Sequence, residues 1–249
     1  MKQLIKEVDA NFVRFSKEWR TTLEAVNTAL QAHEGQYQES YRRLVSLQAW
    51  RVDLLEPHLS PESLAFFVEA QNDALVSHVL ARLGSWRSSL KSLRSLIENV
   101  CLCLYYKDHP VELRLWRIGR HSVSFAVIYE YLQKHPALYS VQPAVAGLDV
   151  LKREYSTLSR AVHASAAGFR MAADGTGVRL WLSDKARVGG WQTRETATLT
   201  GVNLLMLAMF REELQGTKAS NLRKAVSLGV PSGKHKEVKD VLRISLFSP

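Results

Sequence analysis

The stretch EYSTLSRAVHASAAGF, residues 154–169, places Tyr155, Ser159, Arg160 and His163 within about two helical turns. The pKa of a free histidine lies near neutrality, so His163 could act as a general acid or base. Arg160, or Arg94 from an earlier helix, could then stabilise negative charge that develops on a phosphate. The candidate catalytic residues are therefore His163, Arg160 and Arg94. The same side chains could instead bind a ligand without catalysis, or form a buried polar clamp between helices.

Helical spacing predicts which of these side chains face inward. Tyr155, Ser159 and His163 follow one another in steps of four, so each lies beside the last while the row drifts by about 40° per step. Tyr155 belongs to the apolar stripe of its helix, so the row should begin in the core and reach the surface near His163. We expect it to face the helix that carries Arg94 and Glu98, which have the spacing of a helical ion pair. That pair could lie on the surface, or be buried and orient the site. Glu98, Tyr155 and Ser159 are candidate binding residues.

A second basic cluster lies in RLWRIGRHS, where Trp116 stands among Arg114, Arg117, Arg120 and His121. Arginines beside an aromatic side chain suit phosphate contact and base stacking. They also suit the solvated face of a helix. These four basic residues are further candidates for binding.

The chain carries a formal net charge of +9, which favours anionic partners: RNA or another nucleic acid, or an acidic protein. The excess is concentrated near the end. Residues 217–249 hold seven lysines and arginines against two acidic residues. We expect a basic, partly ordered C-terminal tail over 217–249 that strengthens binding to a polyanion.

The composition predicts an all-α protein. Only 7 prolines and 13 glycines interrupt 249 residues, of which 46% are hydrophobic. Apolar residues recur in steps of three and four over long stretches, as in residues 3–33 and 86–107, which is typical of amphipathic helices. The apolar run VCLCLYY should lie centrally in a bundle. Near residues 178–190 the pattern alternates enough for a small β-hairpin, and the last strong helix is expected from about 194 to 214.

We therefore expect a multi-helix bundle in one domain, residues 1–216, followed by the basic tail. Within this domain the N-terminal helices, residues 1–83, should pack on a core formed by residues 85–215.

Several classes of site and location are not indicated by the sequence. Cys101 and Cys103 would point in nearly opposite directions on a helix, so we expect two buried, reduced thiols rather than a disulfide or a metal site. No phosphate-binding loop, dinucleotide motif or zinc-protease motif is present, and we expect neither a cofactor nor a metal. No stretch is long and apolar enough to cross a membrane, and the first residues do not form a signal peptide, so we expect a cytoplasmic protein.

Two passages resemble the HEPN superfamily, in particular the larger prokaryotic helical proteins encoded near defence and toxin genes. They are LRSLIENVCLCLYYKDHPVEL and YSTLSRAVHAS, and the resemblance covers about residues 85–170. The matching positions are Arg94 and Glu98 in the first passage and Tyr155, Leu158, Ser159, Val162 and His163 in the second. The resemblance implies a HEPN-like bundle that binds nucleic acid or a nucleotide in a bacterial defence or toxin–antitoxin system, with a homodimer as one expectation.

Two alternatives stay open: a metal-independent endoribonuclease toxin, and a non-catalytic protein-interaction subunit. Ribonucleases of this family have four to six residues between an arginine and the histidine that follows it. Arg51 with His58 and Arg114 with His121 have that spacing, but such pairs occur here about as often as the composition gives by chance. His163 has Arg160 only three residues before it. The sequence therefore leaves catalysis undecided.

Overall fold

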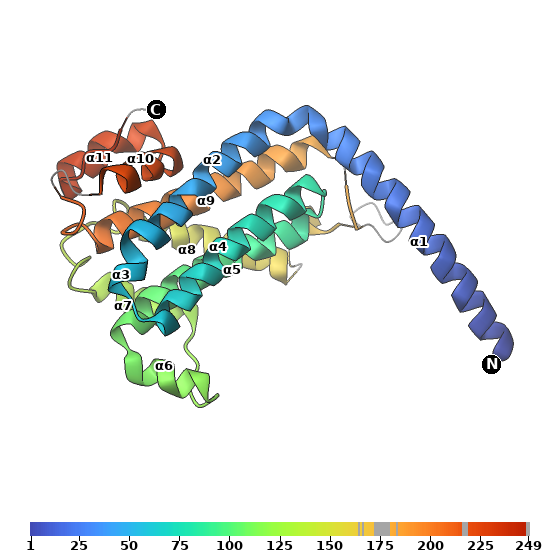
Figure 1. Cartoon of the computed structure of the whole chain (residues 1–249), viewed down its shortest axis with the longest axis horizontal. Coiled ribbons are helices and arrows are strands. Elements are labelled where there is room, and N and C mark those ends of the chain that lie inside the picture. The colour runs from blue at the N-terminus through green and yellow to red at the C-terminus, as the bar shows by residue number, and fades with distance from the viewer. Residues whose placement is uncertain (164, 166, 172–179, 183, 216–218, 248–249) are drawn as a thin grey trace.

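The computed structural model describes residues 1–163, 165, 167–171, 180–182, 184–215 and 219–247 (Figure 1). Helix makes up 79% of these residues, and no strand occurs among them, which confirms the all-α prediction. The helices are α1 (Lys2–Leu30), α2 (Glu34–Trp50), α3 (Glu56–His58), α4 (Pro61–Arg82), α5 (Trp86–Asp108), α6 (Pro110–Arg117), α7 (Phe125–Lys134), α8 (Leu148–Val162), α9 (Lys185–Met209), α10 (Ser220–Gly229) and α11 (Ser232–Leu242).

The core of the bundle lies around α4, α5 and α9. In α9 every residue from Thr198 to Met209 is buried, because this part of the helix is apolar on nearly all sides. In α5 the run VCLCLYY is buried except for the partly buried Leu102, as the sequence predicts. Cys101 and Cys103 lie within it as buried thiols without a disulfide. Burial raises the pKa of both thiols to about 12, so neither is a reactive nucleophile at neutral pH.

Two glycines let α8 pack closely on α9. Gly147 precedes α8 with a φ of +72°, a backbone conformation that favours glycine. A Cβ at this position would collide with the carbonyl oxygen of Gly201 in α9, and a Cβ at Gly201 would lie 2.8 Å from the side chain of Leu151 in α8. These two positions therefore fix where α8, which carries the polar row, crosses the central helix.

The C-terminal segment differs from the expected tail. Helices α10 and α11 are joined to the bundle through buried apolar residues, and α10 packs along α2 (Figure 1). The buried residues include Leu222 and Val226 in α10 and Val238 and Leu242 in α11. Each pair is four residues apart, the spacing of one helix face. The expectation of a partly ordered tail is therefore wrong for the described residues 219–247, which carry two helices, although the amphipathic spacing of VKDVLRISLF, residues 238–247, does indicate a helical turn or two there.

The described part of the expected hairpin is not a strand pair. Residues 185–190 form the first turns of α9, and residues 180–182 and 184 form no strand; residues 178, 179 and 183 lie outside the described part. Helix α9 thus starts nine residues before the expected 194. Asp184 caps it, since its carboxylate accepts a hydrogen bond from the backbone N–H of Ala186 at 2.9 Å.

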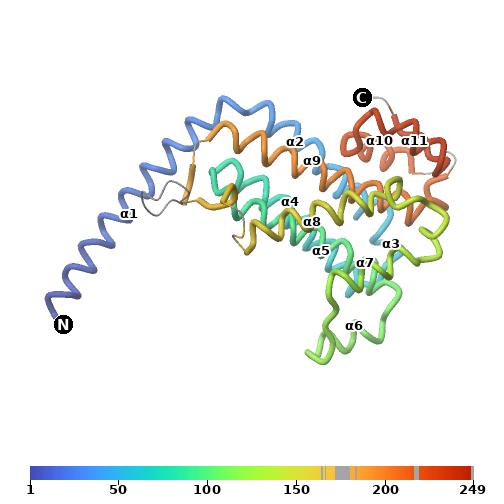
Figure 2. The backbone as a smooth tube through the Cα atoms, turned by 180° about the vertical axis from the view of Figure 1, so that it is seen from behind, coloured from blue at the N-terminus to red at the C-terminus, as the bar shows by residue number. Residues whose placement is uncertain are grey.

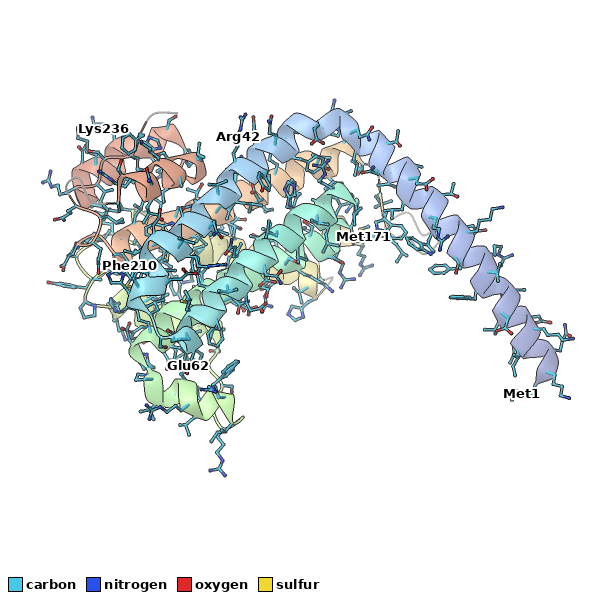
Figure 3. The ribbon with its side chains drawn as sticks, in the orientation of Figure 1. Met1, Arg42, Glu62, Met171, Phe210 and Lys236 are labelled. Carbon is cyan, nitrogen blue, oxygen red and sulfur yellow. The ribbon has the colours of Figure 1, made fainter. Side chains whose placement is uncertain are left out.

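Helix α1 also departs from the expectation that residues 1–83 pack on the core. Figures 1 and 2 show that α1 lies against the bundle only near the C-terminal end of the helix and projects away from it over the rest of its length. Figure 3 places Met1 at the far tip. Only Val26 and Leu30 of this helix are buried. The expectation is therefore wrong for the N-terminal half of α1, although α2 and α4 do pack on the core. None of the helices in the described residues is long and apolar enough to cross a membrane.

Candidate functional site

Helices α5 and α8 lie side by side and run in opposite directions. Polar side chains of α5 therefore contact α8 at two successive levels along the pair. At one end Arg87 of α5 donates hydrogen bonds to the carbonyl oxygens of Ala161 and Val162, both at 3.0 Å. Two turns further along α5, Arg94 reaches Tyr155 and Ser159, which precede those residues in α8. The two arginines are seven residues apart and share one face of α5, about 10 Å apart along its axis.

The first part of the site is the Arg94 cluster, made of Arg94, Glu98, Tyr155 and Ser159. Arg94 donates from Nη2 to the Tyr155 hydroxyl at 2.7 Å and from Nε to Ser159 Oγ at 3.1 Å. Its Nη2 also lies 2.9 Å from Glu98 Oε1, to which the Tyr155 hydroxyl donates at 3.0 Å. Tyr155 and Ser159 therefore face the helix that bears Arg94 and Glu98, as their spacing predicts.

The surroundings of Tyr155 hold this cluster at the edge of the core. The ring of Phe125, in the first turn of α7, stacks on the ring of Tyr155 with centroids 3.7 Å apart. Burial, and then the Glu98 carboxylate beside it, raises the pKa of Tyr155, so the phenol stays protonated and can donate. The side chains of Arg94 and Glu98 remain 23% and 31% exposed. The cluster is thus neither a surface ion pair nor a fully buried one.

His163 does not belong to the Arg94 cluster. It follows the last residue of α8 and is exposed, whereas Tyr155 and Ser159 are half-buried. The expectation that His163 faces inward together with Tyr155 and Ser159 is therefore wrong, and the row ends at an exposed side chain. No described hydrogen bond joins His163 to Arg94, Tyr155 or Ser159, and its exposure shows that the buried-clamp interpretation is wrong for this residue. The clamp between the helices is made by Arg94 instead.

The second part of the site is the arginine pocket. A hollow of about 550 Å³ opens between the start of α5, the end of α8 and the start of α9. Among the described residues its lining includes four arginines, Arg87, Arg160, Arg187 and Arg194, and no acidic residue. The rings of Trp86, Phe169 and Trp191 complete the wall. Arg160, a candidate from the sequence, thus faces this pocket, next to Arg87.

Two of the four arginines, Arg87 and Arg187, donate hydrogen bonds to backbone carbonyls, which are neutral partners. Arg87 binds the two carbonyls at the end of α8, where a cation is favoured by the helix dipole. Arg187 donates to the carbonyls of Gly168 and Arg170 at 3.4 and 3.3 Å and lies 3.4 Å from Asp184. Since a guanidinium has five N–H donors, Arg87 keeps both its full charge and spare donors for a ligand.

The fourth arginine is neutralised to a greater extent. Arg194 donates from Nη1 to both carboxylate oxygens of the buried Glu154, at 3.1 and 3.0 Å. Burial raises the pKa of Glu154, and Arg194 and Arg153 oppose that rise. Arg194 therefore serves mainly to position the wall of the pocket, and the positive potential comes from the other three arginines.

Sequence reasoning missed Arg187 and Arg194 because it placed a hairpin where α9 begins. The signal that could have found them is Asp184, a favoured N-cap residue. Gly189 and Gly190 argued against a helix at this point, since glycine lowers the stability of a helix when it lies in the interior. A Cβ at either position would meet nothing within 4 Å, so no close packing in the described structure requires glycine there.

The basic cluster of α6 lies elsewhere, on a protrusion of the bundle (Figure 1). Arg114, Arg117 and Arg120 are exposed, and Arg117 makes only a long ion pair of 3.5 Å with Glu62. Trp116 is 44% exposed and rests on the ring of Phe66 at 4.9 Å. The structure therefore separates this cluster from the arginine pocket and leaves it accessible.

His121 is less exposed than the three arginines of this cluster. It is half-buried, and its Nε2 atom is buried without a hydrogen-bond partner among the described residues. Its ring lies 6.2 Å from that of Tyr106, whose buried hydroxyl has no described partner either. His121 is thus placed as a packing residue beside the three exposed arginines.

A third polar group is buried between α2, α4 and α9, and sequence reasoning missed it. Ser40 donates to Glu195 Oε1 at 3.1 Å and lies 3.0 Å from Nδ1 of His78, while Arg43 donates from Nε to Glu195 Oε2 at 2.9 Å. Since the single hydroxyl proton of Ser40 points to Glu195, the imidazole must donate to Ser40. In a serine nucleophile the proton goes to the imidazole instead. This buried network is therefore arranged as a structural contact.

Among the described residues no group of three histidine, cysteine or acidic side chains could hold a metal ion. Comparisons with protein-family models, curated proteins and solved structures give no match for this chain. The function must therefore be argued from the geometry of the arginine pocket and the Arg94 cluster.

Proposed function

We propose that this protein binds a phosphate-bearing ligand, RNA or another nucleic acid, in the arginine pocket and along the adjoining Arg94 cluster. The observation that carries the proposal is the pocket wall, whose described lining presents four arginines and no acidic side chain. Guanidinium groups match the geometry of phosphate oxygens and hold their charge at any physiological pH.

The extent of the basic surface supports an extended ligand over a small anion. From the pocket, the shared face of α5 leads through Arg87 to Arg94, about 10 Å further on. The hollow itself, about 550 Å³, is larger than a single phosphate needs. A nucleic-acid strand places phosphates at successive positions, so it could contact the pocket and the Arg94 cluster together.

The HEPN resemblance and its defence or toxin–antitoxin setting are part of the same proposal, because both rest on Arg94, Glu98, Tyr155 and Ser159. We propose binding without cleavage. An exposed His163 with no described hydrogen bond to the Arg94 cluster is poorly placed for general acid–base catalysis, which needs a fixed contact with the reacting group.

The test is binding of a labelled single-stranded RNA, followed by fluorescence polarisation in buffer without metal ions. Arg160→Ala should weaken binding about fivefold or more and lower the magnitude of the salt slope by about 1, because one phosphate contact is lost. Arg160 is the best position to change, since it is exposed and lines the pocket. Arg87 is less suitable because it also caps α8.

Arg14→Ala is the matched control. Arg14 is an exposed arginine of α1 whose described contacts are local, a 2.8 Å hydrogen bond to Asn11 and a 4.0 Å ion pair to Glu18, so its removal costs the same charge at a distance from the pocket. The proposal predicts unchanged binding for this variant. Equal losses for Arg14→Ala and Arg160→Ala would show that net charge alone acts, and would overturn the pocket as the site.

Two further measurements distinguish our proposal from the two alternatives, an acidic protein partner and a ribonuclease. Polyglutamate that binds as tightly as RNA, with the same salt slope, would favour an acidic protein partner instead. RNA that is cut by the wild-type chain but stays intact with His163→Ala would establish the ribonuclease alternative. Under our proposal the RNA is recovered whole, and His163→Ala binds it as the wild type does.

A further inference from the structure

Helix α1 carries an apolar stripe that the rest of the chain covers only at one end. Near the body, Val26 and Leu30 are buried and the ring of Trp19 lies 6.0 Å from that of Trp181. The same stripe continues towards the N-terminus without a partner. Its side chains there are 52–67% exposed: Leu4, Ile5, Val8, Phe12 and Phe15.

The spacing of this stripe is that of a helix that packs along another helix. Ile5, Val8, Phe12, Phe15 and Trp19 alternate in steps of three and four, which are the a and d positions of a heptad repeat. A helix without tertiary contacts is marginal in water, and most of its stability comes from packing of its apolar face. The projecting turns therefore need a partner to be stable, and the described chain supplies none.

The charges of α1 decide between two kinds of partner. The helix carries five basic and four acidic residues, so its net charge is close to zero. A helix that lies on a membrane surface is usually rich in lysine and arginine on its polar face. Because the charges of α1 are mixed, they repel neither a second copy of this helix nor any particular partner. The helix also lacks the excess of positive charge that would attract it to an anionic bilayer.

We propose that the stripe from Leu4 to Phe15 is a self-association surface, covered by the same stripe of a second copy of this chain in a two-stranded coiled coil. A two-fold axis would make the contact self-complementary. The exposed apolar surface of the five side chains is on the order of 500 Å² on each copy, or about 1,000 Å² for the pair, which is the lower bound for a specific interface. The dimer should accordingly dissociate on dilution through the micromolar range.

The test measures the mass of the full chain by sedimentation equilibrium across micromolar concentrations, without any ligand, so that it is independent of the proposed RNA binding. The wild type should approach twice its 28.1 kDa at the highest concentration. The double variant Phe12→Glu, Phe15→Glu should weaken the association at least about tenfold and remain a single chain at that concentration. Both side chains are exposed in the single chain, so the bundle should still fold.

Val13→Glu is the matched control. Val13 is 68% exposed, as Phe12 is 67% exposed, but it lies on the other side of α1 from the stripe. This variant should retain the dimer. A wild type that stays a single chain at every concentration, or a Val13→Glu variant that dissociates as the double variant does, would overturn the proposal. A wild type that is a single chain but co-sediments with phosphatidylserine vesicles would overturn it in favour of a membrane surface.

Discussion

Two polar groups in this molecule use the same kinds of side chain in different surroundings. In the buried network, Glu195 binds Arg43 and Ser40; in the Arg94 cluster, Glu98 binds Arg94 and Tyr155. The side chain of Glu195 is 2% exposed and that of Glu98 is 31% exposed. Both groups join helices that are distant in the sequence. Their chemistry is alike, so the difference in exposure decides what each can do.

The group that resembles a catalytic triad is the one that solvent does not reach. Ser40, His78 and Glu195 are a serine, a histidine and an acid in contact, yet all three are buried and the serine proton points to the acid. The Arg94 cluster has no such resemblance to a triad. It lies at the edge of the core and shares the face of α5 with the arginine pocket, where a ligand can reach it.

The largest predicted effect comes from breaking the buried network. Glu195→Ala should lower the free energy of unfolding by about 3–5 kcal/mol, because it leaves the guanidinium of Arg43 and the hydroxyl of Ser40 buried without their partner. Urea unfolding of both chains, followed by circular dichroism, measures the difference.

A double substitution provides the control for that prediction. Arg43→Met with Glu195→Leu removes both charges and fills their space with apolar atoms, so it should recover much of the lost stability. A loss just as large in the double variant would mean that the cavity, and not the unpaired charge, explains the first result. RNA binding should be unaffected in both variants, provided that they are folded.

A smaller effect is predicted for the Arg94 cluster. Arg94→Ala should cost about 1–2 kcal/mol of unfolding free energy, since its hydrogen bonds and ion pair are partly screened by water. RNA binding should weaken as well, and Arg94→Lys should restore only part of it because lysine lacks the planar fork. A stability loss as large as that of Glu195→Ala, with RNA binding intact, would remove the distinction between the two groups.

The sequence predicts the Arg94 cluster and misses the buried network for a physical reason. Steps of four within one helix place Tyr155 beside Ser159, and Arg94 beside Glu98, so each half could be found without a structure. Ser40, His78 and Glu195 come from three helices separated by 38 and 155 residues along the chain. Periodicity within a helix carries no information about such pairs, which depend on how the helices cross.

The same limit explains the fold-level differences. Amphipathic spacing predicts that α1 is a helix, and it is one over Lys2–Leu30, but spacing cannot show whether the stripe is covered by its own chain. In the last 33 residues, composition and charge favoured a tail, while Leu222 with Val226 and Val238 with Leu242 formed helix faces that pack on the bundle. The helix expected from about 194 to 214 is α9, but its start at Lys185 was missed because Gly189 and Gly190 outweighed the cap at Asp184.

The smallest predicted effect is the pH dependence of stability that His78 contributes in the buried network. Burial, and then the positive charge of Arg82, lowers the pKa of His78 below its ordinary value of 6.5. In the unfolded chain His78 takes up a proton near pH 6.5, whereas in the folded chain it stays neutral to a lower pH and donates from Nδ1 to Ser40. Between these two pKa values the unfolded state binds more protons, so stability should rise with pH and be lost as the pH falls below about 6.5.

The slope for one proton cannot exceed about 1.4 kcal/mol per pH unit, and it disappears below the pKa of the folded state. Urea unfolding between pH 7 and pH 5.5 should show this loss in the wild type and a weaker dependence in His78→Gln, which cannot be protonated. Arg94→Ala should keep the full dependence, because its cluster contains no histidine. A dependence that is unchanged in His78→Gln would show that other groups cause it and that the buried network does not titrate in this range.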